Sequence, residues 1–225
     1  MSAENSQSIA FSDLRTAAYC PRKLYYARRG EREVPPEVLE RREMAFRYPD
    51  LVDAPDAVLA DEPLAVSPRR FRENLDRLRS RDPDLWAAIT DPEAREVLLE
   101  GRECRGIAHK VLADPPRPSL VSAGSPPEDG VWEPRTVHAV AAAKALAWER
   151  ERPVETAVVE YPAHGVVRTV DLTTRRKAAY RRTVRAVRSM DGPPPRLRDD
   201  AKCDPCEYAD ECGVRTRTLR SLLGG

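Results

Sequence analysis

The sequence has few aromatic residues, no long apolar run and almost no net charge. Aromatic residues make up 6% and apolar residues 41% of the 225 residues, so the chain can bury a core that is mostly aliphatic. No stretch approaches the roughly 18–20 uncharged residues that span a bilayer. The N-terminal segment MSAENSQSIAFSDLR has neither the basic start nor the apolar centre of a signal peptide. We therefore expect a cytoplasmic protein without a membrane partner, and membrane and secreted classes are excluded.

The charge balance hides a marked polarity along the chain. Lysine and arginine total 38 against 37 acidic residues, which leaves a net charge of +1. Basic residues nevertheless dominate residues 168–198, whereas the charged residues of 48–63 are all acidic. Most of the basic residues are arginine, whose guanidinium suits bidentate contact with phosphate. An arginine-rich genome produces the same bias, so this pattern only weakly favours nucleic acid as a ligand.

Proline marks the helix starts in the first half of the chain. Ser67-Pro68, Asp82-Pro83 and Asp91-Pro92 each place a capping residue before a proline at the first helical position. They predict helices at about 68–80, 83–90 and 92–103, and a weaker helical pattern covers 37–47. We interpret residues 34–100 as a helical insertion in a single domain that spans residues 1–225.

The rest of the chain alternates between helical and strand patterns. Residues 12–29 predict a helix that restarts at Pro21. The later pattern predicts strands at 106–113 and 119–124, a helix at 135–151, a hairpin of strands at 154–161 and 165–172, and a basic helix at 174–190. This order indicates an α/β or α+β fold.

Three of the five cysteines lie close together near the C-terminus. Cys203, Cys206 and Cys212 form a C-x2-C-x5-C run within residues 201–225, and this spacing is typical of metal chelation. A tetrahedral site or a cubane cluster needs a fourth ligand. Cys20 is the better donor because Pro21 follows it, as proline follows ligating cysteines in iron–sulfur proteins. Cys104 has an amphipathic context and is expected to be a small buried residue.

Three interpretations of the cysteines remain open. A disulfide set fits poorly with a cytoplasmic protein and an odd cysteine count. Zinc is possible, although zinc sites usually have two paired half-sites and here one half is a lone cysteine. A [4Fe–4S] cluster held by Cys20, Cys203, Cys206 and Cys212 is the preferred interpretation, and it would join the two ends of the chain.

Two segments together resemble a known family. FSDLRTAAYCPRKLYYARRG near the start and KCDPCEYADECG near the end look like the CRISPR-associated RecB-like exonucleases that carry a [4Fe–4S] cluster. The order of elements in 101–190 is compatible with that family, and residues 31–100 lie outside the resemblance. The resemblance implies a PD-(D/E)XK nuclease core, with a mixed sheet flanked by helices. It also implies action on DNA ends or single strands in antiviral defence, with other CRISPR adaptation proteins as partners.

The resemblance further implies a site for Mg²⁺ or Mn²⁺, made by a His, an Asp and the acid of a Glu-x-Lys motif. A hard cation polarises a phosphodiester and lowers the pKa of the attacking water. His109 in GIAHKVL matches the His, Asp129 stands for the Asp, and Glu133-Pro134-Arg135 falls at the Glu-x-Lys position with arginine in place of lysine. The candidate catalytic residues are therefore His109, Asp129, Glu133 and Arg135, of which the first three are the expected cation ligands.

Three classes of function follow from these patterns. The first is a metal-dependent DNA nuclease. The second is a DNA-binding module that keeps the fold and cluster without the cleavage chemistry, because arginine replaces the motif lysine. The third is an assembly subunit that docks through residues 34–100. The basic helix supports either of the first two, since Arg175, Arg176, Arg182 and Arg185 can follow a phosphate backbone; a solvated helix face is its alternative interpretation.

Overall fold

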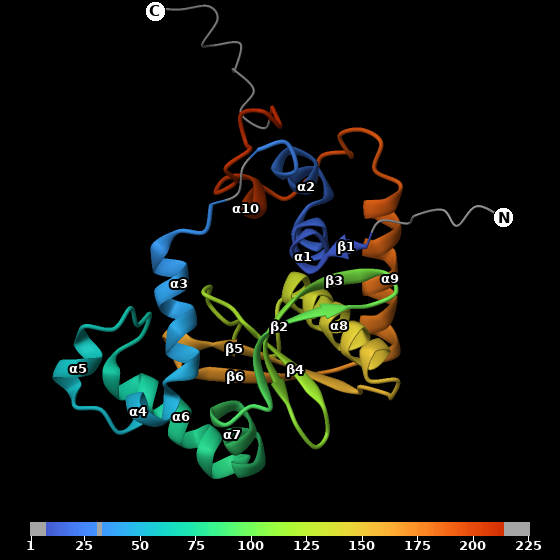
Figure 1. Ribbon diagram of the computed structural model, residues 1–225. Coiled ribbons are helices and arrows are strands. Elements are labelled where there is room, and N and C mark those ends of the chain that lie inside the picture. Colours follow the sequence, from blue (N-terminus) through green and yellow to red (C-terminus); the bar gives the residue numbers. More distant parts are fainter. Residues whose placement is uncertain (1–7, 31–32, 214–225) are drawn as a thin grey trace, which may run out of the picture.

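The computed structural model describes residues 8–30 and 33–213. It is a mixed α/β structure in which one mixed sheet is covered by helices on both faces (Figure 1). The sheet order is β1-β3-β4-β5-β6, and β2 also pairs with β3. Strands β1 and β4 pair with opposite ends of β3, whereas β2 pairs along most of its length. The strands are β1 (Ile9–Ala10), β2 (Ala94–Glu100), β3 (Cys104–Leu112), β4 (Arg117–Val121), β5 (Thr156–Tyr161) and β6 (Val166–Asp171). The pairs β1–β3 and β4–β5 are parallel, and the other pairs are antiparallel.

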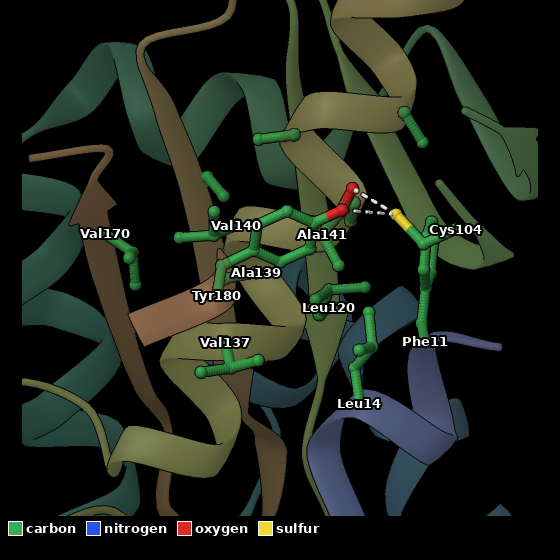
Figure 2. Close-up of a cluster of buried hydrophobic side chains, with 14 of the residues drawn as sticks. Phe11, Leu14, Cys104, Leu120, Val137, Ala139, Val140, Ala141, Val170 and Tyr180 are labelled. Atoms are coloured by element: carbon green, nitrogen blue, oxygen red, sulfur yellow. Dashed lines mark hydrogen bonds between the residues drawn. The ribbon is translucent and has the colours of Figure 1, made fainter. Parts of the chain in front are cut away.

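One face of the sheet packs against α1 (Phe11–Tyr19), α8 (Glu133–Glu149) and α9 (Thr174–Arg188). Helix α8 is buried nearly all round because its central residues are small, including Ala139, Ala141 and Ala142. Figure 2 shows this core, where the Cys104 thiol lies 3.3 Å from the Tyr180 hydroxyl. Cys104 is 1% exposed, which confirms the prediction of a buried cysteine.

The other face is covered by the helices of the insertion. These are α3 (Pro36–Glu43), a 3-10 turn (Met44–Phe46), α4 (Tyr48–Val52), α5 (Asp56–Ala60), α6 (Pro68–Arg81) and α7 (Pro83–Thr90). Apolar residues of these helices form a second core with Leu112, Val121 and Val158 of the sheet. Along β5, Ala157 and Val159 belong to the first core and Val158 to the second, as the alternation of side chains in a strand requires. The insertion is thus one of the layers of the fold.

The predicted helix over 92–103 is wrong. Helix α7 ends before Asp91, and residues 94–100 form β2, which pairs along β3 in antiparallel register. The caps at Ser67 and Asp82 are confirmed, because their side chains accept the backbone N–H groups of Arg70 and Leu85. Asp91-Pro92 carries the same local signature, but pairing with β3 decides the conformation there, and such pairing is not visible in local sequence.

The other predicted elements are present. The 12–29 segment forms α1 and then α2 (Pro21–Ala27), with the restart at Pro21. The hairpin forms from β5 and β6, joined by a 3-10 turn (Pro162–His164), and the basic helix is α9. Near the end of the described chain, α10 (Asp200–Cys203) lies beside α2, so the N-terminal helices contact the C-terminal segment (Figure 1). Within residues 8–30 and 33–213, no helix has the length and apolar character needed to cross a membrane.

Candidate functional site

The four cysteines predicted as ligands line a single pocket between the two ends of the chain. Cys20 caps α2, and its thiol accepts the Lys23 N–H at 3.4 Å. Cys203 closes α10, and Cys206 and Cys212 follow in the turns after it. All four border the same pocket. The fold therefore brings together residues nearly 200 positions apart in sequence.

Contacts between the two ends hold this pocket. The Tyr19 hydroxyl donates to the Lys202 carbonyl at 3.2 Å, and the Tyr26 hydroxyl donates to the Glu211 carbonyl at 3.1 Å. Lys23 lies 2.9 Å from a carboxylate oxygen of Glu207. The ring of Tyr26 stacks on Tyr208 with centroids 6.1 Å apart. Each contact joins the α1–α2 segment to the C-terminal segment.

The thiols are close enough to affect one another. The pKa of Cys203 is raised, first by burial and then by Cys20, Cys212 and Cys206. Within the described part of the chain, however, no three His, Cys, Asp or Glu side chains are arranged so that they could hold a metal ion as they stand. Four thiols that line one pocket fit a metal ion or cluster ligated by thiolates. Their side chains are not, however, at the distances that coordination requires.

A basic groove of about 700 Å³ adjoins the cysteine pocket and shares Tyr19, Lys23 and Lys202 with it. Its other charged side chains include Arg15 from α1 and Arg135 from α8. The remaining lining residues are Thr16, Ser122, Gly124, Ser125, Trp132, Glu133, Pro134 and Ala201. Four of the lining side chains are cationic and one is acidic, so the lining itself is basic, and Lys23 and Lys202 also pair with Glu207 and Asp199.

Trp132 lines the groove with an exposed side chain. Its side chain is among the large apolar ones most exposed in the described residues, at 55%, and its indole N–H donates to the Ser125 carbonyl at 3.0 Å. This bond holds an exposed ring beside cationic side chains. Trp132, Arg15, Lys23 and Lys202 were not predicted as site residues. They lie on three separate segments, so only folding brings them together.

The structure does not bring the predicted cation ligands together. His109 is buried on β3, Asp129 is exposed in the loop before α8, and Glu133 is exposed in the first turn of α8. Glu133 and Arg135 line the groove, but His109 and Asp129 do not. Glu133-Pro134-Arg135 forms the first turn of α8, the helix predicted at 135–151. The Glu133 carboxylate faces Arg182 of α9 at 4.0 Å.

His109 has the chemistry of a neutral hydrogen-bond donor. Burial, followed by the charges of Arg42, Arg135, Arg15 and Lys110, lowers its pKa to about 4. Its Nδ1 accepts the Val121 N–H at 3.1 Å, so in the neutral ring the proton is carried by Nε2. A protonated Nε2 offers a donor and no lone pair. In this arrangement His109 suits an anion better than a metal ion.

The predicted nucleic-acid arginines lie on α9. Arg175, Arg182 and Arg185 are exposed, while Arg176 is partly buried and donates to the Asp171 carbonyl at 2.8 Å. The proximity of Arg182 to Glu133 places α9 next to the basic groove. The two basic surfaces therefore adjoin.

No family model matches the chain, and no curated protein matches it. Among solved structures the chain is similar to one described as "Crystal structure of SSO0001", at 14% identity over 94% of this chain and 88% of that chain, with a TM-score of 0.41.

Proposed function

We propose that the protein binds DNA single strands or ends in the basic groove and belongs with the RecB-like nucleases in fold, as a binding module that has lost their usual metal site. The observation that carries this proposal is the groove itself, which is lined by the exposed Trp132 and by four cationic side chains, Arg15, Lys23, Arg135 and Lys202. Proteins that hold single strands combine these two features: cations follow the backbone and an aromatic ring stacks on a base.

The neighbouring helix α9 extends the basic surface. Arg182 lies beside the groove at Glu133, and Arg175 and Arg185 are exposed on the same helix. Such a surface contacts phosphates independently of sequence, and its contribution to affinity falls with salt. A strand that leaves the groove can continue along α9. A role in antiviral defence with CRISPR adaptation proteins as partners is part of this proposal and rests on the resemblance of the two cysteine segments alone.

The cysteine pocket is proposed to hold a [4Fe–4S] cluster ligated by Cys20, Cys203, Cys206 and Cys212. The common pocket and the convergence of four thiols support this assignment. The cluster would cross-link the start of α2 to the C-terminal segment, because one ligand comes from the first and three come from the second. Tyr19, Lys23 and Lys202 border both the pocket and the groove, so the ligand set also positions one wall of the DNA site.

The binding test uses anaerobically purified protein and a fluorescent single-stranded oligonucleotide, measured by anisotropy. Trp132→Ala removes the stacking ring and should weaken binding by about 1–3 kcal/mol. Trp148→Ala is the matched control. Trp148 is similarly exposed, at 59%, but it lies in the last turn of α8, whereas Trp132 precedes the first turn. Equal affinity of the Trp132 variant and the wild type would refute the groove as the binding site.

Hydrolysis of DNA is the second candidate function. The observation that favours it is Glu133, an expected cation ligand that lines the groove. The assay is Mn²⁺-dependent degradation of end-labelled single-stranded DNA, with Glu133→Ala run in parallel. Cleavage that is lost in the variant would establish a divalent site that includes Glu133. Absence of cleavage, or equal cleavage by both proteins, would leave the binding function.

A further inference from the structure

Cationic side chains from several elements lie close to one another beside the groove. Arg135 lines the groove, and burial followed by the charge of Arg15 lowers its pKa to about 10. Arg15, Arg42 and Arg135 each lower the pKa of both His109 and His138. These five side chains come from α1, α3, α8 and β3, and the three arginines are near enough to both histidines to act on their charge. We call them the arginine–histidine cluster.

Within the part of the chain that the structure describes, the nearby carboxylates do not pair with Arg42 or Arg135. Glu133 lines the same groove but is exposed and faces Arg182. Glu96 of β2 is near enough to Arg42 for the two charges to interact, yet burial raises the pKa of Glu96. Among the described residues, neither Arg42 nor Arg135 forms an ion pair with a carboxylate. A half-buried guanidinium without a counter-charge is costly in a folded protein.

Two buried polar groups next to Arg135 lack hydrogen-bond partners. His138 is 7% exposed and Tyr161 is 1% exposed, and neither the His138 Nδ1 atom nor the Tyr161 hydroxyl has a hydrogen-bond partner among the described residues. Arg135 influences the pKa of both groups, so both lie near its charge. His138 follows Arg135 by three positions on α8, which places the two on the same helix face. Buried polar groups are nearly always partnered, so this position has the character of a ligand site.

We propose that the arginine–histidine cluster binds a phosphate group, with Arg135 and Arg42 as the charged contacts and His109 Nε2–H and the Tyr161 hydroxyl as neutral donors. One guanidinium group can donate two parallel hydrogen bonds to the oxygens of a phosphate, and it stays charged when it is partly buried. The phosphate comes either from inorganic phosphate or from the terminal phosphate of a strand in the groove. The second source rests on the proposed function, and the first does not.

The first experiment measures thermal unfolding in inorganic phosphate and in chloride at matched ionic strength. Phosphate at about one hundred times its dissociation constant should raise the unfolding midpoint of the wild type by about 5 °C or more. Arg135→Gln should abolish this shift, and in chloride it should unfold at the same temperature as the wild type or higher, because an uncompensated charge is removed. Arg81→Gln, on the exposed end of α6, should keep the full phosphate shift. If Arg135→Gln does not fold, Arg42→Gln replaces it.

The second experiment separates the two sources. Oligonucleotides of one sequence, with a 5′-phosphate, a 3′-phosphate or hydroxyl ends, are compared by anisotropy in a buffer without phosphate. At least tenfold tighter binding of one phosphorylated form, lost in Arg135→Gln, would identify the strand end as the source. Equal affinities together with stabilisation by inorganic phosphate would identify the free ion.

The proposal and the DNA-binding function fail separately. Absence of any phosphate-dependent shift, together with equal affinities for all three oligonucleotides, would overturn the phosphate site even if DNA binds tightly. A phosphate shift that depends on Arg135 in a protein that does not bind DNA would establish the site and refute the DNA function. A shift that is equal in the wild type and Arg135→Gln would also overturn the site.

Discussion

Lys110 and Glu160 form an ion pair with both side chains fully buried, at 2.8 Å between Nζ and Oε2. The Lys110 ammonium also donates to the carbonyls of Ala45 and Ile89, and the Ser119 hydroxyl donates to Glu160 Oε1 at 2.5 Å. Ala45 and Ile89 belong to the insertion, whereas the other three residues are on β3, β4 and β5. This network therefore fastens the helical insertion to the sheet.

Removing one partner of this pair should be strongly destabilising. Lys110→Met leaves the Glu160 carboxylate buried without a counter-charge, and we expect a loss of about 3–5 kcal/mol in the free energy of unfolding. The double variant Lys110→Met/Glu160→Leu should recover a substantial part of that loss, because neither charge remains. Urea unfolding of the wild type, the two single variants and the double variant measures the coupling. A loss below about 1 kcal/mol in the single lysine variant would contradict this role.

The cysteine assignment predicts a selective loss of iron. Cys203→Ser should abolish the brown colour and the bound iron and sulfide, and it should loosen the contact between α2 and α10. Cys104→Ala is the matched control, since Cys104 is buried in the core with Tyr180 and should affect stability while iron content is retained. Metal and acid-labile sulfide analysis of anaerobically purified protein measures both. Zinc in place of iron, without sulfide, would support the zinc interpretation.

The basic helix should contribute to the salt dependence of DNA binding. Arg182→Ala/Arg185→Ala removes two exposed cations, and the slope of log affinity against log salt for single-stranded DNA should become shallower by about 1.4. Anisotropy titrations at several chloride concentrations give the slope. Arg69→Ala/Arg70→Ala, on α6 of the insertion, is the control and should leave it unchanged. Identical slopes in all three proteins would remove α9 from the binding surface.

The buried histidines should make the fold sensitive to mild acid. The native pKa of His109 is lowered to about 4, whereas the unfolded value is close to the ordinary 6.5. Between these values the unfolded chain binds a proton that the native chain does not. The neutral His109 therefore stabilises the fold fully above pH 6.5. This stabilisation, about 3 kcal/mol in the free energy of unfolding, is lost as the pH falls toward 4.

His109→Asn isolates this effect from the titration of carboxylates, because an amide oxygen can accept the Val121 N–H without binding a proton. Urea unfolding at pH 7.5 and pH 4.5 should show a smaller loss of stability in this variant than in the wild type. His164→Asn is the control, since His164 is only partly buried. Equal losses in His109→Asn and the wild type would mean that His109 does not titrate in this range.

The helix starts at Pro68 and Pro83, the hairpin and the local grouping of Cys203, Cys206 and Cys212 were predictable from the sequence, whereas the helix start expected at Pro92 was wrong. Each depends on neighbouring residues: a capping side chain three positions before an amide, alternation along a strand, or the short spacing from Cys203 to Cys212. The sequence also indicated a basic helix at 174–190. The cation site of His109, Asp129 and Glu133 was inferred from the resemblance alone. The structure does not group these three side chains, and the assignment stays a prediction.

What tertiary structure alone decided depends on contacts between distant segments. Asp91-Pro92 resembles Asp82-Pro83 locally, yet residues 94–100 form a strand because β3 offers them hydrogen-bond partners. Lys110 and Glu160 are separated by 50 residues, and their meeting depends on the order of strands in the sheet. Arg42 reaches the arginine–histidine cluster only because the insertion folds back onto the sheet. Local sequence encodes caps and periodicity, whereas burial of charge is determined by which surfaces the fold brings together.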